Sequence, residues 1–308
     1  MKQTIVITPG EISGVGLEVT LKALSSITKN KSHKNISFVF FAGKKDLETH
    51  FDLLEISNLS LNSCSSLTLP VNPGFHWIDS QSSPFTWFKN SVDFCSSNSS
   101  TTALVTGPLR KSSFKESGAV GHTDYLRNNF SEPCFMTFFG EIYNSLLLSD
   151  HLSLDKVSEL NFDLLLNQAL SVLEKFFSKT DPAKKIALIG LNPHAGEGGL
   201  IGQIDENIHK PFAKLHKDIL EGPLPADSFF SPDSYKKYSF VIANYHDQAL
   251  IPFKLLHGFD GAQASLGLPF VRTSVDHGTA DDLYLKNKAN PKSMLKAINL
   301  AIELLNLN

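Results

Sequence analysis

Short, almost continuously apolar runs recur along the chain and are separated by segments with helical periodicity. A run without the polar alternation of a half-exposed strand is typical of a parallel strand that helices cover on both faces. The pattern therefore predicts an α/β fold. The runs are TIVIT at 4–8, SFVFFAG at 37–43, TALVTG at 102–107, NSLLLSD at 144–150, KIALIGL at 185–191 and YSFVIAN at 238–244.

Two longer segments carry apolar residues at the spacing of one helix face. They predict helices over 163–177 and 291–307. Asn290 followed by Pro291 marks the start of the second helix, because Asn caps helices and Pro fits their first turn. Stretches rich in Ser and Asn, at 56–66 and 93–101, are expected to be surface loops or frayed helix ends.

Composition narrows the class of partner. The 308 residues carry a formal net charge of -3, with 42% hydrophobic and 19% charged residues. Such a chain lacks the basic field that draws proteins to nucleic acid or to anionic membranes, so small molecules are the expected partners. Three scattered cysteines, and no apolar run of signal-peptide or membrane-span length, lead us to expect a cytoplasmic protein.

Three histidines each follow one of the apolar runs: His151, His194 and His246. In α/β sheets, ligands bind in the crevice beyond the carboxyl ends of the strands, so these side chains could converge there. Three imidazoles with one open position form a recurring catalytic site for divalent metal ions. The alternative is that each histidine is hydrogen-bonded at a strand end, and spacing alone does not decide between the two.

Further polar residues cluster in three other places. Lys254 and Arg272 flank the run ASLGLPF and suit a phosphate or carboxylate, although two solvated surface cations are the commoner arrangement. In GHTDYL, His122 and Thr123 precede a helix, where they could bind a phosphate oxygen or where Thr123 could act as the cap. The loop PGEISGVG lacks the spacing of a dinucleotide fingerprint, so we interpret it as a tight structural turn.

Several motifs appear together in a characteristic order: TPGEISGVG, TGPLRK, GHTDYL, DHLSL, LNPHAGEGG, NYHDQAL and SLGLPFVRTSVDHGTA. In this order the chain resembles the 4-hydroxythreonine-4-phosphate dehydrogenase family of vitamin B6 biosynthesis, from about residue 4 to 305. The resemblance implies a two-domain fold similar to isocitrate and isopropylmalate dehydrogenases, with the active site in the inter-domain cleft. The expected domains are 1–110 with 255–308, which carries the cofactor loop, and 111–254, which carries the metal ligands and the dimer interface.

The resemblance also implies roles for individual residues. It makes His151, His194 and His246 the ligands of one divalent ion, zinc, magnesium or cobalt, in a homodimer with shared active sites. It assigns substrate contacts to His122, Thr123, Lys254, Gln263 and Arg272, with Lys254 and Asp247 as catalytic residues. It assigns NAD or NADP to the loop that contains His277, Gly278, Thr279, Ala280 and Asn290.

The implied reaction is oxidation of 4-phosphooxy-L-threonine by NAD(P), followed by loss of carbon dioxide. The sequence departs from the family pattern where Gln263 replaces an asparagine and where Tyr284 and Leu285 replace an Ala-Gly pair. Three alternatives therefore stand beside the main hypothesis. They are a dehydrogenase of another phosphorylated hydroxy acid, a metal-dependent hydrolase or lyase, and a non-catalytic metabolite-binding protein.

Overall fold

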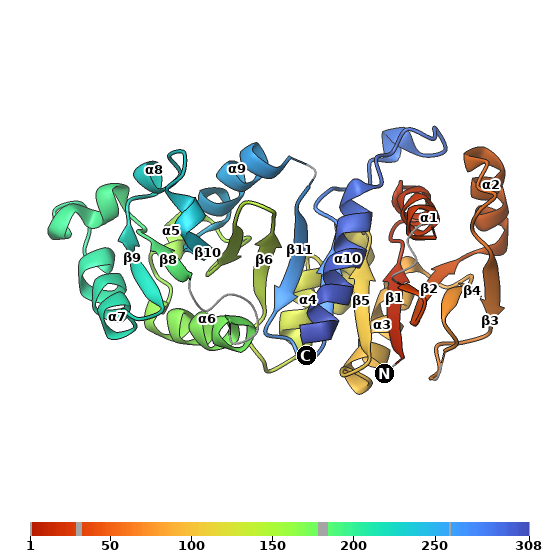
Figure 1. The fold of residues 1–308 in the computed structure, drawn as a ribbon, viewed down its shortest axis with the longest axis horizontal. Coiled ribbons are helices and arrows are strands. Elements are labelled where there is room, and N and C mark those ends of the chain that lie inside the picture. The colour runs from red at the N-terminus through yellow and green to blue at the C-terminus, as the bar shows by residue number, and fades with distance from the viewer. Residues whose placement is uncertain (1, 29–32, 70, 178–183, 259, 308) are drawn as a thin grey trace. The chain divides into compact units, whose positions relative to one another are not determined.

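The computed structural model describes residues 2–28, 33–69, 71–177, 184–258 and 260–307 (Figure 1). The chain forms two compact units, one of Met1–Glu132 with Ala262–Asn308 and one of Pro133–Gly261. Both boundaries fall later in the chain than the expected 110/111 and 254/255. No helix in the described ranges is long and apolar enough to cross a membrane.

The first unit is built on strands in the order β3-β4-β2-β1-β5-β12-β11. The strands from β3 to β12 pair in parallel, and β11 runs antiparallel to β12. The central strands are buried on both faces, as their apolar runs predicted. The bounds are β1 (Gln3–Thr8), β2 (Ile36–Ala42), β3 (Leu61–Cys64), β4 (Gly74–Asp79), β5 (Thr102–Thr106), β11 (Ala262–Leu266) and β12 (Val271–Ser274).

Helices cover this sheet. Helix α10 packs against α1, β5 and β12, and α3 packs against β1 and β5. The predicted start of α10 is confirmed, because the Asn290 side chain accepts a hydrogen bond of 3.0 Å from the Lys292 backbone N–H. The helices are α1 (Gly16–Ile27), α2 (Lys44–Leu54), α3 (Pro84–Ser97), α4 (His122–Asn129) and α10 (Lys292–Leu307), with 3-10 turns η2 (Lys111–Ser117) and η6 (Asp281–Leu283).

The expectation of surface loops or frayed helix ends in the Ser- and Asn-rich stretches was wrong for part of the first stretch. Residues 61–64 form the edge strand β3, which tolerates polar side chains because none of its four residues is buried. In the second stretch, residues 93–97 form the end of helix α3, in line with the alternative of a helix end, and Val92 and Cys95 are buried on the inner face of that helix.

The second unit orders its strands β6-β7-β10-β8-β9. Strands β7, β10, β8 and β9 pair in parallel, and β6 runs antiparallel to β7. The strand bounds are β6 (Phe135–Phe139), β7 (Asn144–Leu147), β8 (Lys185–Ile189), β9 (Leu220–Leu224) and β10 (Tyr238–Ala243). The helices are α5 (Leu154–Val157), α6 (Phe162–Phe177), α7 (Lys210–Leu215), α8 (Ala226–Phe229) and α9 (His246–His257), with shorter turns η3 (Pro193–Gly199), η4 (Asp205–His209) and η5 (Tyr235–Lys237). Both units are thus α/β, which confirms the predicted class.

This strand order determines where the motifs meet. In the first unit, β1, β5 and β12 are parallel neighbours, so the loops that follow them leave the sheet at the same edge. In the second unit, β7, β10 and β8 are parallel neighbours, and each precedes one of the three candidate histidines. Polar residues far apart in the sequence are therefore gathered at the carboxyl ends of the strands in each unit.

Candidate active site

His151 and His246 lie side by side at the ends of β7 and β10. Their ring centroids are 5.5 Å apart, with the ring planes inclined by 37°. Nδ1 of His246 lies 2.7 Å from the carboxylate of Asp247. A carboxylate can only accept, so this Nδ1 carries the proton and Nε2 keeps the lone pair that a metal ion needs. The pair has the chemistry of two metal ligands, with Asp247 orienting one of them.

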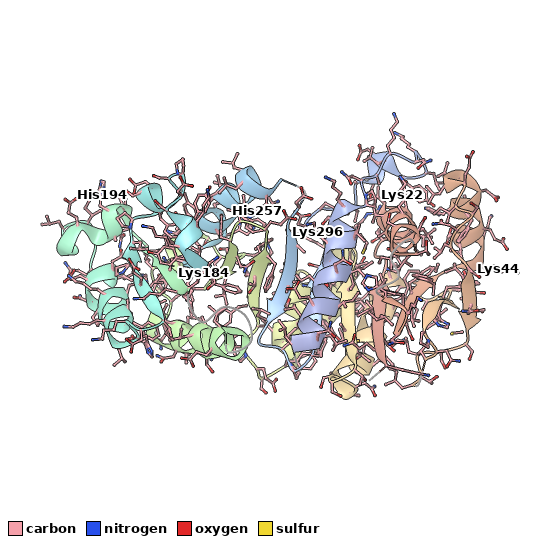
Figure 2. All side chains as sticks on the ribbon, viewed as in Figure 1. Lys22, Lys44, Lys184, His194, His257 and Lys296 are labelled. Atoms are coloured by element: carbon pink, nitrogen blue, oxygen red, sulfur yellow. The ribbon has the colours of Figure 1, made fainter. Side chains whose placement is uncertain are left out.

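His194 lies outside this pair. It is exposed in the turn η3 after β8, and Figure 2 shows it at the left edge of the view. Across the described ranges, no three His, Cys, Asp or Glu side chains are grouped so that they could hold a metal ion. Within one chain the structure therefore brings together two of the three predicted ligands and not the third.

The turn that carries His194 has an unusual backbone. His194, Ala195 and Glu197 adopt positive φ angles of 52°, 51° and 44°. Non-glycine residues rarely adopt this left-handed conformation, which costs roughly 1–2 kcal/mol for each residue. The neighbouring Gly196 and Gly198 adopt it without that cost. A turn of this kind persists only if the surrounding structure holds it in place.

Asp205 supplies that support. Its fully buried carboxylate accepts hydrogen bonds from the backbone N–H groups of Leu191 and Asn192, at 2.7 and 2.9 Å, and from the Asn192 side chain. Burial alone would raise the pKa of Asp205, but hydrogen bonds from His209, Asn192 and Leu191 outweigh it and lower the pKa below its ordinary value. The carboxylate is therefore ionised and fixes the start of the turn. Sequence reasoning did not identify Asp205.

A buried amide network joins the three strand ends. Asn244, directly after β10, donates to the carbonyl of Ile189 at 2.8 Å, and Ser149 donates to the carbonyl of Asn244. Gln248 accepts from the backbone N–H of Asn244 and donates to the carbonyl of Gly190, each at 2.8 Å. These side chains tie together the segments before His151, His194 and His246. Sequence reasoning missed them too, although Gln248 stands within the motif NYHDQAL.

Arg272 is a buried cation of the first unit. Its side chain, on β12, is 2% exposed and donates to Ser265 at 3.0 Å and to Thr106 at 2.6 Å. The alternative of a solvated surface cation is therefore wrong for Arg272. Lys254 differs, because it lies exposed on α9 of the second unit. Gln263 is half-buried on β11 and accepts a hydrogen bond from Ser274.

His122 and Thr123 open helix α4, whose capping residue is Gly121, so the alternative role of Thr123 as the cap is wrong. The His122 ring packs edge-on against Phe88 and Phe114, with centroids 4.7 and 5.1 Å away. Burial first, and then the charge of Arg272, lower the pKa of His122 well below its ordinary value. His122 is therefore neutral at pH 7. Its buried Nε2 has no hydrogen-bond partner among the described residues and can serve a bound molecule.

The loop after β12 contacts the glycine-rich turn after β1. The backbone N–H of Val15 donates to the carbonyl of Thr279 at 3.0 Å, and a Cβ on Gly14 would lie only 2.8 Å from that oxygen. Gly14 thus serves close packing, which confirms the interpretation of this turn as structural. Arg110 adds a second tie, because it donates to Ser13 and, at 2.7 Å, to Asp281.

Within the same loop, His277 resembles His122 in its unsatisfied nitrogen. Nδ1 of His277 is within hydrogen-bond distance of the Gly278 carbonyl. The buried Nε2 lacks a hydrogen-bond partner within the described part of the chain. The far end of the loop is held by Glu18, which is fully buried and accepts from the Ala289 backbone N–H and from Lys22, at 2.8 and 2.7 Å.

The departure from the family pattern at Tyr284 and Leu285 falls in this loop. The Tyr284 ring lies against His50 of α2, with centroids 6.1 Å apart. Leu285 is exposed and has a φ of 54°, a conformation that suits the glycine expected there.

Comparisons with known proteins identify the family of the chain. Residues 12–301 match the family model described as pyridoxal phosphate biosynthetic protein PdxA. The chain is 34% identical to the 4-hydroxythreonine-4-phosphate dehydrogenases of Sulfurihydrogenibium sp. and of Campylobacter fetus, in each case over 97% of both chains.

Solved structures give the same result. A 4-hydroxythreonine-4-phosphate dehydrogenase from Klebsiella pneumoniae is 27% identical, with a TM-score of 0.81 over 99% of this chain and 98% of that chain. The enzyme of that name from Burkholderia phymatum gives 26% and 0.76 over the same shares. A terephthalate 1,2-cis-dihydrodiol dehydrogenase from Burkholderia xenovorans, 22% identical, shares the fold with a TM-score of 0.62. The chain belongs to the PdxA family of pyridoxal phosphate biosynthetic proteins.

Proposed function

We propose that the protein is an NAD(P)-dependent 4-hydroxythreonine-4-phosphate dehydrogenase. It oxidises the secondary hydroxyl of 4-phosphooxy-L-threonine to give 2-amino-3-oxo-4-phosphooxybutanoate. This β-keto acid then loses carbon dioxide and becomes 3-amino-2-oxopropyl phosphate. The observation that carries the proposal is the match over 97% of both chains to dehydrogenases of that name. The buried cation Arg272 and the strand-end histidines would supply the chemistry that such a substrate requires.

Arg272, His122 and Thr123 would bind an anionic group of the substrate. Arg272 carries a permanent charge in a buried setting, where it attracts a phosphate or carboxylate more strongly than it would in water. The Nε2 of neutral His122 lacks a hydrogen-bond partner among the residues that the structure describes. It could donate a hydrogen bond to an anionic oxygen of the substrate, or it could accept one from a hydroxyl. Lys254 and Gln263 complete the proposed substrate contacts, with Lys254 as a mobile point charge.

His151, His194 and His246 would hold one divalent ion. Two observations suggest that these residues fit a metal ion. The rings of His151 and His246 lie side by side, and Asp247 orients the ring of His246. Imidazole donors favour zinc or cobalt over magnesium. When bound, the ion would supply Lewis acidity to the hydroxyl that is oxidised. Asp247, exposed beside His246, would keep that ring in its ligating tautomer and could take up a proton.

The loop from His277 to Asn290 would bind NAD or NADP. The unsatisfied Nε2 of His277 and the left-handed turn at Ala280 are features that a bound nucleotide would explain. The cofactor would supply the hydride acceptor. Thr279 would fix the loop against the Gly14 turn, and Asn290 would end it at the cap of α10. Gly278 would leave open space for the nucleotide, since a Cβ there would meet no atom of the described residues within 4 Å.

We further propose a cytoplasmic homodimer that shares its active sites. His194 lies outside the pair formed by His151 and His246, and a second copy could supply it. The test mixes inactive His194→Ala protomers with inactive His246→Ala protomers, with exchange verified by native mass spectrometry. Shared sites predict the return of part of the activity in mixed dimers. Mixed dimers without activity would contradict the shared site.

The proposed activity is tested by following NAD(P)H formation with 4-phosphooxy-L-threonine, with NAD or NADP, before and after removal of metal with a chelator. We expect turnover with at least one nucleotide, its loss after chelation and its return with zinc or cobalt. A four-carbon sugar-acid phosphate is the competing substrate. Exclusive turnover of that compound would favour the alternative dehydrogenase, and no turnover of either would contradict the proposal.

A further inference from the structure

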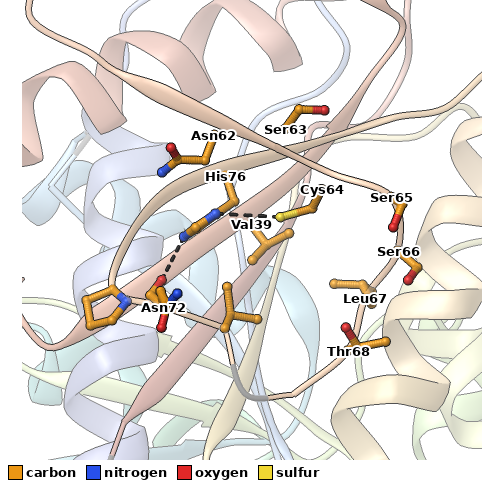
Figure 3. A pocket seen from close by; sticks show the side chains of 12 residues that line it. Val39, Asn62, Ser63, Cys64, Ser65, Ser66, Leu67, Thr68, Asn72 and His76 are labelled. Carbon is orange, nitrogen blue, oxygen red and sulfur yellow. Dashed lines mark hydrogen bonds between the residues drawn. The ribbon is translucent and has the colours of Figure 1, made fainter.

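A second candidate site lies in the first unit, on the face of β3 and β4. The chain returns from β3 to β4 through residues 65–73, a Ser-, Thr- and Pro-containing crossover that forms no helix in its described part. A polar crossover leaves more space over the sheet than an apolar helix would. The result is a pocket of about 500 Å³ (Figure 3).

The pocket contains a cysteine paired with a histidine. Figure 3 shows Sγ of Cys64 directed at the His76 ring, and the distance from Sγ to Nδ1 is 3.6 Å. Both residues line the pocket, Cys64 at the end of β3 and His76 within β4. The sequence gives no hint of the pair, because twelve positions and an irregular crossover separate the two residues.

The tautomer of His76 is fixed by the backbone. Nε2 lies 2.7 Å from the carbonyl of Asn72, which can only accept, so Nε2 carries the proton. Ser37 donates to the same carbonyl at 2.8 Å and holds it in place. Nδ1 is therefore the ring nitrogen that faces Cys64 and can accept the thiol proton. The His76 side chain is 6% exposed, so this orientation is locked by its surroundings.

A thiol beside such a nitrogen has a general base within reach, and Nδ1 can take the thiol proton as the sulfur attacks. The other two cysteines contrast with Cys64, since both are buried and burial raises the pKa of Cys95 to about 12. Cys64 lines the pocket, whereas Cys95 and Cys134 are buried.

We propose that Cys64 and His76 form a thiol-modification site that exchanges with a small polar disulfide of the glutathione type. Sγ of Cys64 attacks one sulfur of the disulfide, a new S–S bond forms, and the old S–S bond breaks. His76 takes the thiol proton at Nδ1 and delivers it to the departing thiolate. The products are a mixed disulfide on Cys64 and one free small thiol, so no further oxidant is needed.

The lining of the pocket suits a polar reagent of this kind. Hydroxyl and amide groups of Ser65, Thr68 and Asn62 line the same pocket and could bind peptide-like groups. Val39 lies behind the pair at the sheet and gives the pocket an apolar floor.

The test treats the reduced full-length protein with oxidised glutathione and follows the intact mass and the modified peptide. We expect one adduct per chain, at Cys64, formed about tenfold or more faster than on the same cysteine in the urea-unfolded chain. Cys64→Ser should abolish the adduct, whereas Cys134→Ser should leave it unchanged. His76→Gln should slow it to the rate of the unfolded chain.

A missing adduct would overturn the proposal. So would equal rates in the native and unfolded chains, or an adduct on Cys95 or Cys134 instead.

Discussion

Asp205 and His209 form a fully buried pair behind the turn that carries His194. Oδ1 of Asp205 lies 2.8 Å from Nδ1 of His209, and neither side chain is exposed. The His209 ring packs edge-on against Phe162 of α6, with centroids 5.1 Å apart. The backbone of Leu191 and Asn192 is thus anchored through Asp205 and His209 to the core of the second unit. An exposed histidine in a glycine-rich turn is positioned by residues well away from it in the sequence.

Asp205→Asn should loosen this turn. The amide keeps the size of the side chain, but it cannot accept all the hydrogen bonds that the carboxylate accepts. We expect a loss of about 2 kcal/mol in the free energy of unfolding, measured in urea, and a larger loss of turnover than of substrate affinity. Glu206→Gln is the matched control, because its exposed pair with Lys210 contributes little. Equal effects of the two substitutions would contradict the anchoring role.

His122 should make stability depend on pH. Its pKa in the folded chain lies well below 6.5, because of burial and then the Arg272 charge, while the unfolded chain binds a proton near pH 6.5. Below that pH the unfolded state holds the extra proton, so the free energy of unfolding falls as the pH falls from about 6.5 toward the folded pKa. The free energy of unfolding of the wild type, taken relative to that of His122→Gln, should therefore decrease when the pH is lowered from 7.5 to 5.5. An unchanged difference in urea titrations would contradict a neutral buried His122.

Gln248→Met should remove the hydrogen bonds that connect the segments after β8 and β10. Methionine fills a similar volume, but it leaves the carbonyl of Gly190 and the backbone N–H of Asn244 without their side-chain partner. We expect a loss of about 2–3 kcal/mol in the free energy of unfolding and weaker metal retention, measured by elemental analysis after gel filtration. Gln168→Met on α6 should change neither quantity. Full metal retention in Gln248→Met would show that this network does not position the histidines.

Glu18→Gln should weaken binding of the nucleotide and have little effect on the chemical step. The substitution removes the charge that holds Lys22 and weakens the contact to Ala289, so the end of the loop from His277 to Asn290 is less restrained. We expect the KM for NAD or NADP to rise several-fold while kcat at saturating nucleotide changes little. Exposed Glu174 on α6 provides the control substitution. A fall in kcat with an unchanged nucleotide KM would contradict this role.

The parts of the fold that local pattern determines could be predicted from the sequence. Apolar runs identified the central strands, and Asn290 marked the start of α10, because burial and capping are local properties. The edge strand β3 was missed because it buries little and so carries no apolar signal.

The candidate site divides in the same way. Its histidines could be found from their places after strands, and the resemblance to a known family gave them roles. Asp205, Gln248 and Glu18 could not be found so easily, because each acts through backbone groups that only the folded chain brings close. The Cys64–His76 pair depends on an irregular crossover that local periodicity does not describe.

The proposed reaction is tested most directly by counting its products. The protein is incubated with 4-phosphooxy-L-threonine labelled at the carboxyl carbon and with the preferred nucleotide, and reduced nucleotide and labelled carbon dioxide are measured together. Oxidation followed by decarboxylation predicts equal amounts of the two, and loss of both in His246→Ala. Carbon dioxide without reduced nucleotide, or neither product from a folded, metal-loaded protein, would contradict the dehydrogenase assignment.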